Sequence, residues 1–173
     1  QQDPSIGIAH RTSPTNIGMM LLSTVAGYDL GYVSLRGLEV RLRNSLETVE
    51  HLQRYRGHLL NWYDTRTLAP LAPRYVSAVD SGNLAGALVA LKSACAEVQS
   101  APCVRSALWQ GLADTIGLLE ESLERMFEGG DESAFAGAGK QARAMRQAAL
   151  AARNEPQSWL RTIQTLGEME SGD

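Results

Sequence analysis

The sequence predicts an all-α protein, an antiparallel bundle of five or six helices, and three observations support this class. Outside residues 55–79, every long segment repeats its apolar residues at steps of three and four, the period of a helix with one buried face. Residues typical of helix starts and ends, such as Ser-Pro pairs and glycines, lie between these segments. Outside that same stretch, no segment alternates apolar and polar residues as a strand does. Short connections between successive helices favour an antiparallel arrangement.

The first two helices have clear boundaries in the sequence. Residues 1–12 are polar and without period, so they predict an extended lead-in. Ser13-Pro14 predicts a helix start, because Ser caps free amide groups and Pro suits the first helical position. This helix ends at Gly27 or Gly31. Ser34 begins a second helix, whose inward residues are Leu35, Leu38, Leu42, Leu46, Val49 and Leu52.

Residues 55–79 have no helical period and predict a long loop with at most one small hairpin. The stretch YRGHLLNWYDTRTLAPLAPRYVSAV contains two prolines and three arginines and is rich in Trp and Tyr. A connection of about 25 residues is much longer than usual inside a compact helical domain. Loops of this length are either disordered or functional, and the aromatic and aliphatic content argues against disorder.

Four further helices are expected in the second half. Asp80 is predicted to cap the third, with Leu84, Leu88, Leu91, Cys95 and Val98 inward. Pro102 is predicted to open the fourth, with Leu108, Leu112, Ile116, Leu119, Leu123 and Met126 inward. Gly129-Gly130 breaks the chain before an Ala-rich fifth helix over about 131–153. A short sixth helix starts near Pro156, with Trp159, Ile163 and Leu166 inward. The predicted regions are therefore 1–12, 13–100 and 101–173.

The composition excludes several functional classes. A net charge of −3 without a basic patch argues against nucleic-acid binding. No run of 18 apolar residues occurs, so we expect a soluble segment that does not insert into a membrane. Cys95 and Cys103 lack metal-ligand spacing and predict two buried, inert thiols. We expect neither a metal nor a cofactor.

Three polar segments are predicted to meet at one end of the bundle. In an up-and-down arrangement, the start of the first helix, the long loop and the start of the third helix share an end. These segments are Ser13-Pro14-Thr15-Asn16, Asn61-Trp62-Tyr63-Asp64-Thr65 and Asp80-Ser81-Gly82-Asn83. We therefore expect a shared site at this end.

The residues at this end suit a sugar. Aromatic rings with polar rims match the apolar face and hydroxyl edge of a pyranose, and the candidates are Trp62, Tyr63 and Tyr75. Side chains that can bind hydroxyl groups are Asn16, Asp64, Arg74, Asp80 and Asn83.

Simpler interpretations of these residues remain. Asp80 can be only a helix cap, and Trp62 only core. Asp64 can pair with Arg66 or Arg74, or can form an acid–base pair with Asp80 if their separation allows. His51 and His58 are expected to be surface or loop residues.

Two segments, AHRTSPTNIG (9–18) and YRGHLLNWYDTRTLAPLAPRYVSAVDSGNLAG (55–86), together with the amphipathic helix between them, closely resemble the bacterial cyclic β-1,2-glucan synthases. The resemblance covers roughly residues 9–92, in order and at the same spacing. Ala78 departs from the family pattern, which usually has Thr there. Residues 100–173 resemble the family only as generic helices.

The resemblance implies a segment of a large inner-membrane glycosyltransferase that builds cyclic glucan from UDP-glucose. This segment would open the glycoamylase-like domain, as part of an (α/α)₆-type barrel plus a helical insertion, on the cytoplasmic side. The catalytic glutamates would lie downstream, so we expect no catalytic residue here and an inactive isolated chain. The implied partners are a β-1,2-glucan chain and the remaining domains of the parent enzyme. The alternative is a helical interaction or dimerisation module of the same enzyme. Barrel membership also predicts an exposed apolar patch on the first and third helices.

Overall fold

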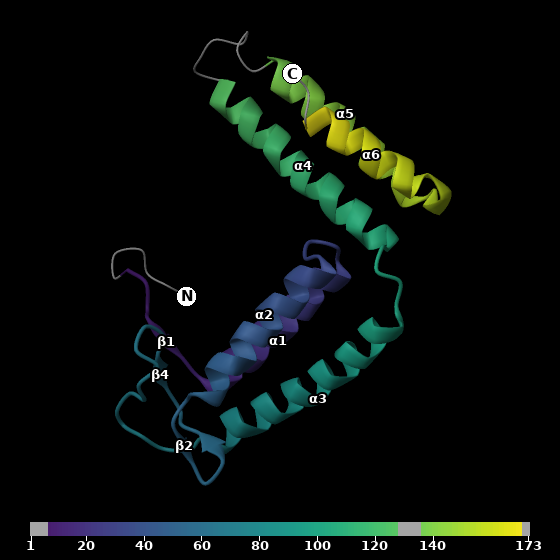
Figure 1. Ribbon diagram of the computed structural model, residues 1–173. Helices are drawn as coiled ribbons and strands as arrows, with labels where there is room; N and C mark the ends of the chain where they lie inside the picture. The colour runs from purple at the N-terminus through teal and green to yellow at the C-terminus, as the bar shows by residue number, and fades with distance from the viewer. Residues whose placement is uncertain (1–6, 128–135, 171–173) are drawn as a thin grey trace. The chain divides into compact units, whose positions relative to one another are not determined.

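The computed structural model describes residues 7–127 and 136–170 (Figure 1). These residues form six α-helices, one short 3₁₀ helix and four strands of two residues each. The all-α prediction is confirmed, whereas the (α/α)₆ barrel stays a prediction. In the described ranges, no helix combines the length and the apolar character needed to cross a membrane.

The chain divides into two compact units, which are described separately. Unit 1 comprises the chain up to Ala26 together with Arg36–Ala101, and unit 2 comprises Gly27–Leu35 and the chain from Pro102 onward. Unit 1 holds most of α1 (Pro14–Asp29), nearly all of α2 (Leu35–Glu50), and α3 (Ala78–Ser100). Unit 2 holds the last turn of α1 and α4 (Ser106–Phe127), α5 (Ala136–Arg153), η1 (Pro156–Ser158) and α6 (Trp159–Glu170).

The start of α1 is confirmed at the predicted Ser-Pro pair. The buried Ser13 hydroxyl accepts a hydrogen bond from the Asn16 amide at 3.3 Å, as expected of a capping serine. Further along α1, Gly18 leaves room for α3, because a Cβ atom there would lie 2.9 Å from the Cβ of Ala87. The buried side chains of the three helices include Ile17, Leu21, Leu38, Leu42, Ala87 and Leu91.

The start and the buried face of α3 differ from prediction. Ser77 caps the helix, and its hydroxyl accepts from the Asp80 amide at 3.1 Å, so Asp80 lies within the first turn. Leu88 and Cys95 are exposed, although both were predicted to point inward. Apolar residues occur all around α3, so leucine spacing alone does not identify the buried face.

Exposed apolar side chains do occur on the first and third helices, as expected (Met19, Met20, Val79, Leu88 and Val89). That they form one continuous patch stays a prediction.

The long loop is built from short paired segments. β2 (Arg54–Tyr55) and β3 (His58–Leu59) form the small hairpin expected there. Arg56 and Gly57 connect them with φ angles of 49° and 86°, the left-handed pair of a type I′ turn. β1 (Arg11–Thr12) pairs with β4 (Tyr63–Asp64) in antiparallel register.

The segment around β4 is held from both sides. On one side it pairs with β1, and the Thr65 amide donates to the His10 carbonyl at 3.1 Å. On the other side, the Leu71 amide donates to the Trp62 carbonyl at 2.9 Å. The loop is thus a hydrogen-bonded structure, as its composition predicted.

Unit 2 is a helical hairpin with α6 packed on α5 (Figure 1). The contact of Arg146 with Glu120 and that of Arg153 with Gln110 fix α4 and α5 as antiparallel. The rings of Trp109 and Trp159 lie 6.3 Å apart. The buried core of unit 2 consists of Trp109, Ala113, Ala149 and Ala152, with Trp159 and Leu166 packed against it.

Several boundary and burial predictions for unit 2 are wrong. The fourth helix begins at Ser106, not Pro102, and its residues Leu112, Leu119 and Met126 are exposed. Ile163 is also exposed. The reason is that α4 and α5 meet through alanines and a tryptophan, so Leu112 and Leu119 face away, whereas Ile116 is buried as predicted. Gly129-Gly130 and the first residues of the predicted fifth helix lie outside the described residues.

Two glycines allow the turn after α1 to approach α4 within unit 2. Gly31 has φ +87°, and a Cβ atom there would lie 1.8 Å from the Ala107 carbonyl oxygen. A Cβ atom at Gly111 would lie 2.2 Å from the Gly31 carbonyl oxygen. Neither position can therefore hold a larger residue without moving the backbone.

The two cysteines differ from prediction in their burial. Cys95 and Cys103 are both free and exposed. Cys95 lies on the outer side of α3, and Cys103 lies in the connection before α4. The expectation of buried thiols is wrong because the inward faces of these segments are set by other residues.

Candidate functional site

Thr15 joins the start of α1 to the start of α3. Its hydroxyl donates a hydrogen bond to the Asp80 carboxylate and accepts one from the Asn83 side-chain amide at 3.1 Å. The bond from Thr15 is the main reason why the pKa of Asp80 is lowered. The first and third predicted polar segments are therefore in direct contact. Asn16, one residue further along α1, has an exposed side chain.

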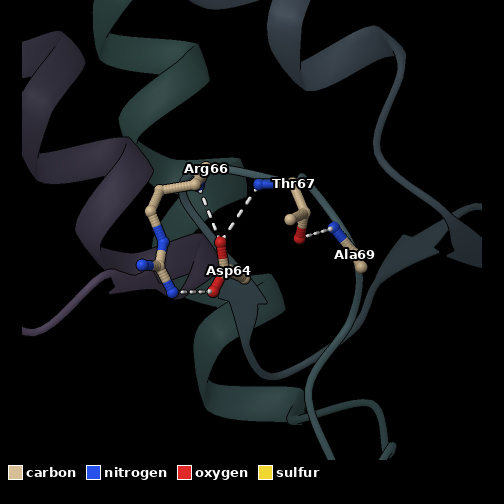
Figure 2. A network of polar contacts seen from close by, with 4 residues as sticks. All are labelled: Asp64, Arg66, Thr67 and Ala69. Carbon is tan, nitrogen blue, oxygen red and sulfur yellow. Dashed lines mark hydrogen bonds and ion pairs between the residues drawn. The ribbon is translucent and has the colours of Figure 1, made fainter.

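Asp64 organises the tight turn that follows β4 (Figure 2). One carboxylate oxygen accepts from the Arg66 amide at 2.8 Å and from the Thr67 amide at 3.0 Å. The other oxygen accepts from the Arg66 guanidinium at 3.2 Å. These bonds, led by the Arg66 amide, lower the pKa of Asp64 to about 2. The structure thus supports the interpretation in which Asp64 pairs with Arg66.

Trp62 and Tyr63 have different surroundings, although they are neighbours. Tyr63 is fully buried, and its hydroxyl accepts from the Leu60 amide and donates to the Gln53 carbonyl at 2.7 and 2.6 Å. Its ring therefore belongs to the core and presents no face to a solute. Trp62 is partly buried, and the Arg11 guanidinium lies 5.0 Å from its ring centroid. This is the distance of a cation–π contact.

Arg74 and Tyr75 line a half-open concavity beside the β2–β3 hairpin. Its volume is about 340 Å³, and the other lining residues are Gln53, Arg54, Tyr55, Leu60 and Val76. The buried Asn61 holds this segment in place. Its amide donates to the Tyr75 carbonyl at 2.9 Å, and its side-chain oxygen accepts from the Tyr75 amide at 3.4 Å.

A second concavity lies between the hairpin and the first turns of α1 and α3. Its volume is about 190 Å³, and its lining includes Pro14, His58 and Ser81. The His58 ring nitrogen Nδ1 lies 3.3 Å from the Ser81 hydroxyl. His58 is exposed, as predicted for a loop histidine.

The eight candidate residues therefore occupy neighbouring but separate places at one end of unit 1. Asp80 and Asn83 both form hydrogen bonds with Thr15. Trp62 and Asp64 lie beside β1, whereas Arg74 and Tyr75 line the larger concavity. In the part of the chain that the structure describes, no hydrogen bond or ion pair joins Asp64 to Asp80. Sequence reasoning missed Thr15, Asn61 and Tyr55. Thr15 and Asn61 lie within the predicted polar segments, and this position is the sequence feature that could have identified them.

The chemistry of this end favours binding over proton transfer. A glycosidase acid needs a raised carboxyl pKa, whereas the pKa values of Asp64 and Asp80 are both lowered. Neither carboxylate therefore has the raised pKa of such an acid. Within residues 7–127 and 136–170, no three acidic, His or Cys side chains are grouped to hold a metal ion.

Comparison with known proteins identifies a relative of this chain. No family model matches the chain. It is 43% identical over 127 residues to the cyclic β-(1,2)-glucan synthase NdvB of Rhizobium meliloti (strain 1021). The match covers 73% of this chain and only 4% of the relative.

The matched stretch is longer than the resemblance noted above. It must include residues 47–127 wherever it begins, because only 46 of the 173 residues lie outside it. It therefore contains the long loop, the start of α3 and all of α4. The chain is thus related in sequence to a small segment of a cyclic β-(1,2)-glucan synthase.

Proposed function

We propose that this chain is a glucan-contacting, non-catalytic segment of a cyclic β-1,2-glucan synthase. The observation that carries the proposal is the assembly of three sequence-distant segments at one end of unit 1. Thr15 links α1 to Asp80 and Asn83. In the same region, β1 pairs with the strand that contains Asp64, and its Arg11 contacts the Trp62 ring. The relationship to a glucan synthase supplies the ligand class.

The accessible side chains at this end suit neutral hydroxyl groups. Asn16 and Asn83 are exposed amides, and Trp62 and Tyr75 present partly open or exposed rings. Amides and ring faces are common partners of hydroxyl edges and apolar sugar faces. Synthesis from UDP-glucose and a position on the cytoplasmic side of an inner membrane stay predictions for the parent enzyme.

The proposal is tested by calorimetric titration of the full chain with linear β-1,2-glucan oligosaccharides. We expect saturable binding, and little or none with α-1,4-linked oligosaccharides of equal length. Absence of saturable heat with either sugar would contradict the proposal. Release of glucose from the β-1,2-glucan would contradict its non-catalytic part.

A second candidate function is an interaction module, and the exposed face of α4 favours it. Leu118, Leu119 and Met126 are 62%, 51% and 65% exposed. Such side chains mark interaction surfaces when they are contiguous. The occupant would be another domain of the parent, since the matched relative is many times longer than this chain. Concentration-dependent self-association without glucan binding, measured by sedimentation, would point to a second copy instead.

A further inference from the structure

The half-open concavity beside the β2–β3 hairpin has the size of a small ligand site. Its volume of about 340 Å³ is at the lower end of the range for small-molecule pockets. This is enough for one or two sugar rings but not for a long chain. It is formed entirely within unit 1, by residues 53–55, residue 60 and residues 74–76.

Two tyrosine rings of this concavity are open to solvent. Tyr55 is 57% exposed and Tyr75 is 52% exposed. Exposed rings with a hydroxyl rim can pack on the apolar face of a pyranose while the rim binds hydroxyl groups. By contrast, Tyr63 fills the core beneath the loop.

The backbone that carries both rings is fixed. Tyr55 pairs with His58 across the hairpin, whose turn has the geometry favoured for two-residue connections. Tyr75 is held through both backbone groups by the buried Asn61. The rings therefore project from ordered backbone, which lowers the entropy that ligand binding must overcome.

The charges of the lining distinguish between possible ligands. The Arg54 guanidinium donates to the Val49 carbonyl at 3.3 Å, so it is already engaged. Arg74 forms no hydrogen bond or ion pair with any residue in the described ranges. The Arg56 guanidinium lies 5.5 Å from the Tyr55 ring centroid, so it is engaged in a cation–π contact on that ring. Arg74 is then the one free guanidinium beside the two tyrosine rings, which suits a neutral sugar with vicinal hydroxyls better than a phosphate, since a phosphate usually recruits several cations.

We propose that this concavity is a glucosyl-binding subsite in which Tyr55 and Tyr75 contact sugar faces and Arg74 binds hydroxyl groups. The inference rests on the proposed function and deepens it, because it places the contact at the hairpin and residues 74–76. It also adds Tyr55, which lies inside the stretch shared with the glucan synthase.

The test is calorimetric titration of the full chain and its variants with linear β-1,2-glucan oligosaccharides. We expect Tyr55→Ala, Tyr75→Ala and Arg74→Ala each to weaken binding about tenfold, the effect of losing one good contact. Tyr55→Phe should stay within about threefold, because the ring face remains. Circular dichroism spectra establish that each variant is folded.

Matched control variants are available elsewhere in the chain. Tyr32 is 57% exposed in unit 2, and Arg41 is exposed on α2. Tyr32→Ala and Arg41→Ala should each change the affinity less than about twofold, since exposed side chains outside a site contribute little.

The outcomes separate this inference from the proposed function. If the Tyr55→Ala/Tyr75→Ala double variant binds glucan as tightly as the wild type, the subsite is wrong and the proposed function stands. If the wild type binds no glucan, both the subsite and the proposed function are wrong. If inorganic phosphate at equal concentration displaces bound glucan from the wild type, the concavity is an anion site and the inference is overturned.

Discussion

The loop end of unit 1 and the helical hairpin of unit 2 are stabilised in different ways. The loop end is held by hydrogen bonds, in which buried polar groups such as Asn61 and the Tyr63 hydroxyl support main-chain segments. Unit 2 is held by packing, with alanines on facing helices and two tryptophans filling the space between them. Directional hydrogen bonds fix the positions of nearby side chains, as a binding site requires, so the loop end can hold a site although it is not helical.

The two regions also expose different surfaces. The loop end exposes tyrosines, arginines and asparagine side chains beside two concavities. Unit 2 exposes aliphatic side chains of α4 and α6, including Leu118 and Leu160. Small polar ligands therefore fit the first surface, and apolar partners fit the second. The following substitutions test this contrast.

The largest expected effect is in the packed core of unit 2. Trp109→Ala removes a ring that is only 3% exposed, and the cavity should cost about 3–5 kcal/mol of unfolding free energy. Urea unfolding, followed by circular dichroism, measures this loss. The control Leu118→Ala, at an exposed position of the same helix, should change stability by less than about 0.5 kcal/mol. Equal effects of the two substitutions would show that the core is placed wrongly.

The next largest effect on stability is expected at Gly31, and it is compared with a substitution at Gly86, whose surroundings differ. Gly31→Ala places a methyl group against the Ala107 carbonyl at a left-handed backbone position, so it should destabilise the protein by about 2 kcal/mol or more. Gly86→Ala, in the middle of α3 with open space around it, should instead stabilise by about 0.5–1 kcal/mol. Thermal unfolding of both variants measures these changes in stability. A Gly31→Ala variant as stable as the wild type would contradict the close approach of the turn to α4.

A smaller loss is expected from one buried hydroxyl of the loop end. Tyr63→Phe removes the acceptor of the Leu60 amide and the donor to the Gln53 carbonyl. Leaving such groups without partners costs about 1–3 kcal/mol. Tyr75→Phe, where the ring is exposed, is the control and should be nearly neutral in urea unfolding. If Tyr63→Phe is also neutral, hydrogen bonding does not hold the loop as described.

The smallest effect depends on pH and concerns the turn after β4. The pKa of Asp64 is about 2 when folded, below its ordinary value of 3.8, so its charge stabilises the fold above pH 3.8. This contribution is lost as the pH falls through 2. Asp64→Asn keeps an acceptor for the Arg66 amide but lacks the charge. The stability advantage of the wild type over Asp64→Asn should therefore shrink between pH 4 and pH 2, and a constant difference would contradict this account.

Local signals in the sequence predicted the helices well. Ser13-Pro14 starts α1 because capping and the fixed φ of Pro depend on adjacent residues. The loss of period at residue 55 likewise identified the loop and its small hairpin. Such features need no knowledge of the rest of the chain.

Features that depend on distant residues were predicted less well. On α3 and α4, Leu91 and Ile116 are buried as predicted, whereas Leu88 and Leu112 are exposed. The alanines Ala87 and Ala113 were missed, and they are buried because small side chains allow helices to approach closely. Tyr63 was expected to be available to a sugar, yet its hydroxyl completes two main-chain hydrogen bonds and its ring is buried. Thr15 and Asn61 acquire their roles only when α1, the loop and α3 are together.

The most direct experiment on glucan binding at the loop end is to map glucan contacts along the chain. Two-dimensional ¹H–¹⁵N NMR spectra are recorded while linear β-1,2-glucan oligosaccharide is added to the full chain. We expect saturable shifts of amides in residues 13–16, 53–65 and 74–83, with residues 106–127 and 136–170 unaffected. Shifts centred on α4 to α6, with none in the loop end, would contradict this expectation.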